Sequence, residues 1–221
     1  LNCFKYTPIS QELIKSTKRI AVGDLTHRID IRTRNEIGQL ADSFNIMTIE
    51  LQDSKAKMDE QDWLKTGQTW LNSMMQGEHD DIMALARDVI SYLASYLDAH
   101  IGAIYLAGND NILRRIGGYA IYEAQNLSNE FRIGEGLVGQ AALERKNILI
   151  SNLPDDYIRI NSGLGESVPR NILVAPFLHN REVKVVIELG SFGQFSDLHI
   201  DFIGAISEEV AIAFDFVQSC S

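Results

Sequence analysis

The chain has 221 residues, of which 45% are hydrophobic and 23% are charged, a composition typical of a folded protein with one or two domains. Its formal net charge is −10, and the excess of acidic residues in its second half argues against nucleic acid, whose phosphates require a basic surface. Residues 1–75 contain ten Lys and Arg against ten Asp and Glu, whereas residues 76–221 contain ten against twenty. This change in charge balance favours a domain boundary near residue 76.

The two cysteines, Cys3 and Cys220, lie near opposite ends of the chain and indicate neither a disulfide framework nor a metal cluster. They fit a reducing compartment. No apolar run approaches the ~18 residues of a membrane span, and no signal peptide is visible. The chain opens at Leu1 without a methionine, and we therefore expect it to be a segment of a longer protein.

Residues 8–51 predict two helices joined by an ordered connector. Their apolar positions recur in steps of three and four: Ile9, Leu13 and Ile20 with Ser16 among them, then Leu40, Phe44, Met47 and Leu51. A seam this narrow and short needs partner helices to bury it. Gly23 suits the end of the first helix, Asn35 suits the N-cap of the second, and Glu36 complements the dipole of the second helix.

This stretch resembles a HAMP domain, the signal-relay module found just inside the membrane in bacterial sensor proteins. The resemblance is carried by Pro8, Gly23-Asp24-Leu25, Asn35-Glu36-Ile37-Gly38, Phe44-Asn45-Ile46-Met47 and Leu51. The family usually has Asp at the position of Asn35. The resemblance implies a transmembrane helix upstream, a relay core formed by the apolar positions above, and a relay connector that includes Gly23, Leu25 and Glu36. A generic helical hairpin or coiled-coil linker is the alternative.

Residues 36–75 contain no proline and predict one continuous helix, roughly 60 Å long at 1.5 Å per residue. The step of six residues from Met58 to Leu64 breaks the heptad phase within it. We therefore expect three parts: a relay in residues 1–53, a connecting signalling helix in 54–77, and a further domain in 78–221.

Residues 78–221 predict an α+β layer, an antiparallel sheet with helices on one face. The expected helices are 80–97, 136–143 and 197–217, the last with Ser196 as its N-cap, and the expected strands are 101–106, 112–119, 131–133, 147–151, 171–178 and 183–192. Residues 152–170 are expected to form a long loop, and loops of this length often carry function.

Residues 78–217 resemble a GAF domain, the small sensory domain of bacterial signalling proteins and phosphodiesterases. The resemblance is carried by Gly134-Glu135-Gly136-Leu137-Val138-Gly139-Gln140, Asn152-Leu153-Pro154-Asp155-Asp156-Tyr157, Ser162-Gly163-Leu164-Gly165-Glu166, Pro169-Arg170-Asn171 and Glu188-Leu189. It implies a central antiparallel sheet flanked by helices, with a pocket roofed by loops between residues 120 and 170.

The residues that we expect to face this pocket are Tyr119, Phe131, Tyr157, Arg159 and Arg170. An arginine above an apolar pocket can bind a carboxylate or phosphate through its planar fork. The alternative, in which Arg170 pairs with Glu166 or Asp155 and holds the loop together, is favoured over ligand binding.

The sequence lacks the residues that several known ligands of GAF domains require. The cysteines lie outside the pocket, which argues against a covalent bilin and against the reduction of free methionine sulfoxide. The Asn-Lys-Phe-Asp-Glu signature of cyclic-nucleotide GAF domains is missing. His100 and His179 lie on or beside strands, where structural roles are favoured over haem ligation. No metal site is predicted.

The order of the two resemblances is that of membrane-bound sensor histidine kinases. No histidine lies in a phosphoacceptor motif and no ATP-binding boxes follow, so the segment itself is not expected to be an enzyme. The resemblance implies a parent kinase in the inner membrane, with this segment on the cytoplasmic side. We expect a homodimer through parallel helices that passes a transmembrane or small-molecule signal to a kinase domain of the same chain. The alternatives are a dimerisation scaffold without a ligand and the regulatory segment of a chemoreceptor or nucleotide cyclase.

Overall fold

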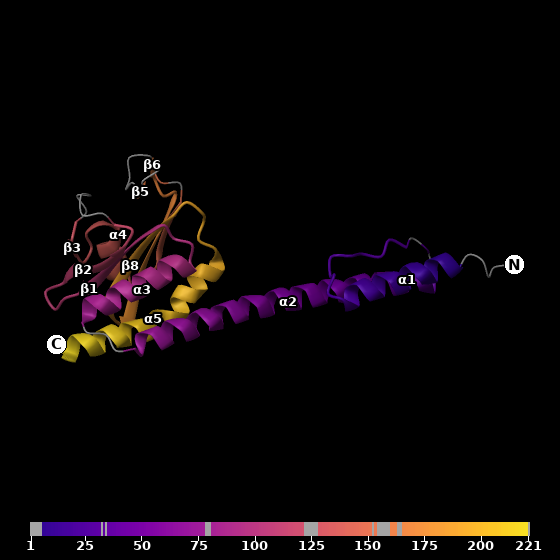
Figure 1. Cartoon of the computed structure of the whole chain (residues 1–221), viewed down its shortest axis with the longest axis horizontal. Helices are drawn as coiled ribbons and strands as arrows, with labels where there is room; N and C mark the ends of the chain where they lie inside the picture. The colour runs from indigo at the N-terminus through magenta and orange to yellow at the C-terminus, as the bar shows by residue number, and fades with distance from the viewer. Residues whose placement is uncertain are drawn as a thin grey trace. The chain divides into compact units, whose positions relative to one another are not determined.

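A computed structural model describes the backbone of residues 6–31, 33, 35–77, 81–121, 128–151, 153, 160–162 and 165–220 (Figure 1). Side chains are described for the same residues except 6–10, 12–13, 160–162, 165–166 and 220. The chain forms two compact units, Leu1–Trp63 and Leu64–Ser221. The division falls within helix α2 (Glu36–Met75), which begins in the first unit and ends in the second.

The first unit contains α1 (Tyr6–Ala21), a connector and the beginning of α2. Gly23 has a φ of +94°, a left-handed conformation that ends α1, and its N–H donates to the carbonyl of Ile20 at 2.9 Å. Asn35 caps α2, because its Oδ1 accepts the N–H of Gly38 at 3.4 Å. The helix ends predicted at Gly23 and Asn35 are confirmed.

Helix α2 runs unbroken for 40 residues, as the absence of proline predicted. Its C-terminal part belongs to the second unit, where Leu71 is fully buried. There Tyr92 donates its hydroxyl hydrogen to the carbonyl of Gly67 at 2.9 Å. A Cβ at position 67 would lie 2.4 Å from Cε1 of Tyr96, so only glycine allows α2 this close to α3 (Ile82–Tyr96).

Within the described residues, the second unit is built on six antiparallel strands in the order β3-β2-β1-β8-β7-β4. The strands are β1 (Ile101–Ala107), β2 (Ile112–Tyr119), β3 (Glu130–Arg132), β4 (Ile148–Ser151), β7 (Asn171–His179) and β8 (Glu182–Ser191). They match the predicted strands to within a few residues. Strands β1 and β8 lie at the centre, and their register places Ala103 opposite Glu188.

Two further strands, β5 (Ile160–Ser162) and β6 (Gly165–Ser167), pair with each other as a separate two-stranded sheet. The expectation of a loop throughout residues 152–170 is wrong for these two segments. Each strand has only three residues, which is too short to show the alternation of apolar and polar residues that reveals a strand in sequence.

Helices cover both faces of the six-stranded sheet (Figure 1). Helices α3 and α5 (Asp197–Cys220) pack on one face, where Ile90 of α3 lies against Gly102. Helix α4 (Gly136–Glu144) packs on the other, where Val138 and Ala141 share a buried cluster with Ala103. The expectation of helices on one face is therefore wrong. A helix of nine residues carries too little periodicity to show in sequence which face of a sheet it covers.

Candidate functional site

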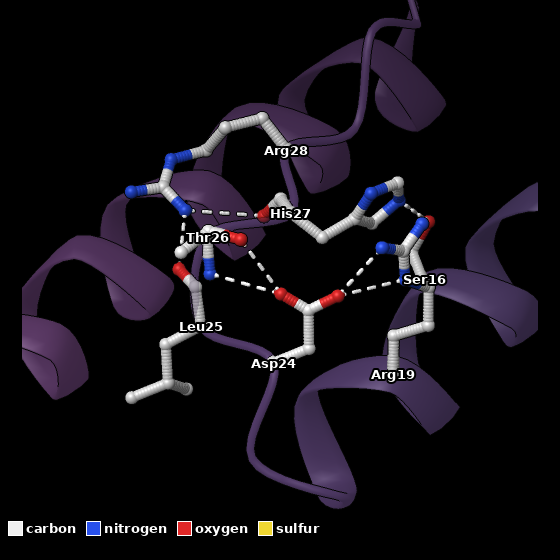
Figure 2. Close-up of polar contacts among 7 residues, drawn as sticks. All are labelled: Ser16, Arg19, Asp24, Leu25, Thr26, His27 and Arg28. Atoms are coloured by element: carbon white, nitrogen blue, oxygen red, sulfur yellow. Dashed lines mark hydrogen bonds and ion pairs between the residues drawn. The ribbon is translucent and has the colours of Figure 1, made fainter.

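The first candidate site lies where the end of α1 meets the connector, and Figure 2 shows its polar contacts. Arg19 donates to Oδ2 of Asp24 from Nε at 2.9 Å and from Nη2 at 2.6 Å. Thr26 donates to Oδ1 from its hydroxyl at 2.7 Å and from its N–H at 3.3 Å. The hydrogen bonds from Thr26 and Arg19 lower the pKa of Asp24. Because the ion pair is exposed, it shapes the turn more than it stabilises the fold.

Ser16 and Arg28 make further contacts with the connector, which Figure 2 shows. Ser16 of α1 is buried, and its Oγ lies 2.9 Å from Nε2 of His27. Arg28 donates from Nη1 to the carbonyl oxygens of Leu25 at 2.7 Å and His27 at 3.1 Å. Its Nη2 donates to Oε1 of Gln52 on α2 at 3.0 Å. Ser16, the polar residue among the predicted apolar positions of α1, therefore contacts the connector through His27.

Asn45 of α2 fixes the middle of the connector through an arrangement that we call the connector clasp. Its Oδ1 accepts the N–H of Ile29 at 2.8 Å, and its Nδ2 donates to the carbonyl of Ile29 at 2.9 Å. Ile29 is buried, so the amide of Asn45 satisfies two backbone groups that water does not reach easily. Ala41 and Thr48, four residues before and three after Asn45, are buried on the same side of α2.

The α2 part of the predicted relay core lies on a neighbouring face of that helix, which we call the relay seam: Leu40, Phe44, Met47 and Leu51. Leu40 is 51% exposed, Met47 42% and Leu51 45%, whereas Phe44 is half-buried. Ile20 of α1 is also half-buried, and the side chains of Ile9 and Leu13 lie outside the described residues. In the predicted relay connector, Gly23 ends α1, Leu25 is half-buried and Glu36 is exposed at the start of α2.

The second candidate site is a small, half-open pocket on the α4 side of the sheet. The described residues that line it are Ile101, Gly102, Ala103, Tyr105, Ile121, Ile172, Glu188 and Gly190. The volume open to the centres of water molecules is about 30 Å³. A water molecule needs roughly 10–15 Å³ on this measure, so the pocket accommodates a compact chemical group.

Glu188 is the one acidic side chain among the described residues of the pocket wall. It is half-buried, because the pocket gives the side chain a small open surface. Burial removes water from its carboxyl and raises the pKa to about 7. A hydrogen bond from Tyr105 lowers this pKa, but the effect is smaller than that of burial. A carboxyl in this position changes protonation state near neutral pH.

Three of the five predicted pocket residues lie in the part of the chain that the structure describes. Tyr119 is half-buried at the end of β2, and Phe131 packs edge-on against Tyr105 with ring centroids 5.5 Å apart. Arg170 is exposed, and its backbone N–H donates to the carbonyl of Ser191 at 3.0 Å. None of these three residues lines the pocket described above. Tyr157 and Arg159 lie outside the described residues.

Sequence reasoning missed Tyr105 and Glu188 as pocket residues. The available signal was a single acidic residue in the apolar run from Val185 to Leu189, in the middle of a predicted strand. In the part of the chain that the structure describes, no group of three or more His, Cys, Asp or Glu side chains is placed to hold a metal ion. None of the helices described there is long and apolar enough to span a membrane.

Comparison with known families gives two matches in sequence order. The model described as HAMP domain matches residues 11–53, and the model described as GAF domain matches residues 79–215. Among solved structures, the GAF domain of an Acinetobacter phosphoenolpyruvate-protein phosphotransferase is similar to this chain with a TM-score of 0.56 and 14% identity. The alignment covers 72% of this chain and 95% of that one, and it shows the fold alone.

Curated relatives match over shorter stretches. A Nif-specific regulatory protein of Azospirillum lipoferum is 30% identical over 89 residues, which are 40% of this chain and 14% of that protein. The methyl-accepting chemotaxis protein McpA of Bacillus subtilis (strain 168) is 53% identical over 45 residues, which are 20% of this chain and 7% of that protein. The chain thus covers a small part of the length of both relatives.

We expect Asn45→Ala to loosen the connector without unfolding α2, because it removes both hydrogen bonds of the connector clasp. Amide hydrogen exchange at Ile29 should become roughly tenfold faster, the effect of losing a little over 1 kcal/mol of local protection. Ser43→Ala is the matched control, since Ser43 is exposed and its Oγ donates only to Gln39 of the same helix. Equal exchange rates at Ile29 in the two variants would contradict the clasp.

We expect Glu188 to make the stability of the second unit depend on pH. Its folded pKa of about 7 exceeds the ordinary value of 4.5, so the folded state holds this proton more tightly than the unfolded state does. The stabilisation is complete below about pH 4.5 and is lost as the pH rises through about 7. The loss amounts to roughly 3 kcal/mol, since the two pKa values differ by about 2.5 and each pKa unit is worth 1.36 kcal/mol.

Urea unfolding of the native chain and of Glu188→Gln at pH 5 and pH 8 measures this loss. The Gln variant cannot ionise, so it should lack this part of the pH dependence. Glu182→Gln changes an exposed residue on the same strand, so its free energy of unfolding should change between pH 5 and pH 8 as much as that of the native chain. The same change with pH in all three proteins would rule the effect out.

Proposed function

We propose that this chain, which belongs to the GAF domain family and carries a HAMP domain before its GAF domain, is the relay and sensory segment of a membrane-bound sensor histidine kinase. The architecture of a signalling module supports this, as does the similarity to regulatory and chemotaxis proteins. The HAMP domain implies a membrane-associated parent protein. In our proposal the parent lies in the inner membrane and this segment lies on the cytoplasmic side.

The observation that carries the proposal is the relay seam. Three of its four large apolar side chains are between 42% and 51% exposed on a single helix, although apolar residues at a/d spacing are characteristic of helices that pair. The connector clasp occupies the neighbouring face of α2 and leaves the seam uncovered. A second copy of the same helix, in parallel orientation, is the partner that fits this seam.

In the proposed mechanism, a signal from the membrane changes the packing of paired α2 helices at the relay seam. Because α2 runs from the first unit into the second without a break, the change reaches the contacts of Gly67 and Leu71 along the same helix. A ligand in the pocket beside Glu188 would bias the same equilibrium by favouring one of the two packings. A kinase domain in the same parent chain would receive the result.

Disulfide cross-linking tests the paired helices. In a background with Cys3→Ser and Cys220→Ser, Met47→Cys should form an intermolecular disulfide in high yield under mild oxidation, because seam positions face each other across a parallel pair. Asp42→Cys, on the exposed outer side of α2, is the matched control and should cross-link far less. A monomer at high concentration with equal yields for the two variants would contradict the pairing.

The regulatory segment of a chemoreceptor is the second candidate, because 45 residues of this chain are 53% identical to part of a chemotaxis protein. The two candidates differ in chemistry. A parent histidine kinase incubated with ATP should gain one phosphoryl group per active site in a form that acid removes and base does not, as expected for phosphohistidine. Absence of this modification in the intact, membrane-inserted parent would favour the chemoreceptor.

A further inference from the structure

The position of Glu188 is unusual for an acidic side chain. In the centre of the sheet it lies opposite Ala103 of β1 on one side and Val174 of β7 on the other. Ala103 is 5% exposed and Val174 is completely buried, as is Val186 two residues before Glu188 on the same face. A carboxylate in such surroundings loses hydration, and this loss is costly unless a partner compensates for it.

The described surroundings supply only part of that compensation. Tyr105, which follows Ala103 by two residues on the same face of β1, donates a hydrogen bond to the carboxylate. An ionised carboxylate can accept about four hydrogen bonds, so further acceptor capacity remains. No Lys, Arg or His occurs among the described lining residues. The carboxylate of Glu188 is therefore a hydrogen-bond acceptor that has no cationic side chain beside it among the described lining residues.

We propose that this pocket binds a small ligand through a primary ammonium group that pairs with Glu188. The proposal deepens the sensory role proposed above and rests on it. An anionic ligand would place like charge beside the carboxylate, whereas an ammonium group would supply both the missing charge and three hydrogen-bond donors. A neutral donor would supply a hydrogen bond without the charge.

The size and lining of the pocket favour an ammonium over a guanidinium. An ammonium is a compact charge, whereas a guanidinium is planar and wider. The open volume of about 30 Å³ suits a compact head group. Ala103, Ile101 and Ile172 are among the apolar residues of the described wall and suit a short aliphatic chain attached to that head group.

Calorimetric titration of the 221-residue chain at pH 8 tests the proposal with three probes of the same size: n-propylammonium chloride, sodium propionate and 1-propanol, at constant ionic strength. We expect saturable binding of propylammonium, and at least tenfold weaker binding of propionate and propanol. Glu188→Gln should weaken propylammonium binding at least tenfold. Glu182→Gln removes an exposed carboxylate from the same strand and should leave binding unchanged.

Absence of saturable propylammonium binding, equal binding of the three probes, or undiminished binding by Glu188→Gln would overturn the proposal. Ala103→Val gives a second, independent test, because it narrows the pocket opposite Glu188 without changing any charge and should also weaken binding. Cross-linking of the Met47→Cys variant in the absence of any amine tests the pairing of the α2 helices independently of ligand binding. Cross-linking without amine binding would refute the ligand class alone, and amine binding without cross-linking would refute the paired relay alone.

Discussion

Helix α2 must satisfy two different sets of neighbours with one continuous backbone, and both units depend on this constraint. In the first unit the amide of Asn45 holds the backbone of Ile29, and in the second unit Gly67 leaves room for the ring of Tyr96. Because each residue of a helix is hydrogen-bonded to the residue four positions away, α2 is one continuous element between these two sets of contacts. In the relay proposed above, a change in the packing of α2 would pass along this backbone.

The polar contacts of the connector define its path but contribute little free energy. The ion pair between Arg19 and Asp24 lies at the surface, with Arg19 exposed and Asp24 half-buried, and surface pairs are typically worth less than about 1 kcal/mol. In the proposed helix pair, burial of the relay seam would be a stronger contribution to stability. Complete burial of a Leu or Met side chain is worth roughly 1.5–3 kcal/mol, and these side chains are about half exposed, so pairing would add roughly 1 kcal/mol for each. In the proposed pair, the first unit would thus gain much of its stability from association, and its packing would respond to changes across the seam.

Local patterns predicted the elements well, because the forces that define them act over a few residues. The run without proline gave α2, and the cap at Ser196, whose Oγ accepts the N–H of His199 at 3.3 Å, marked the start of α5. Local patterns did not predict contacts between residues that are distant in the sequence. The hydrogen bonds of Asn45 span 16 residues and depend on how the connector folds back over α2. The environment of Glu188 depends on the register between β1 and β8, whose paired residues are 85 positions apart at Ala103 and Glu188.

The charge of the second half and the carboxyl of Glu188 act on a ligand at different ranges. Residues 76–221 carry a net charge of −10, so their field attracts cations and repels anions near the surface. At physiological salt this attraction fades over about 8 Å, and it raises the encounter rate more than the affinity. Selection has to occur inside the pocket, where water is scarce and Glu188 is screened much less. Arg170 lies exposed on the outside, where its charge is screened, and it cannot reverse that preference.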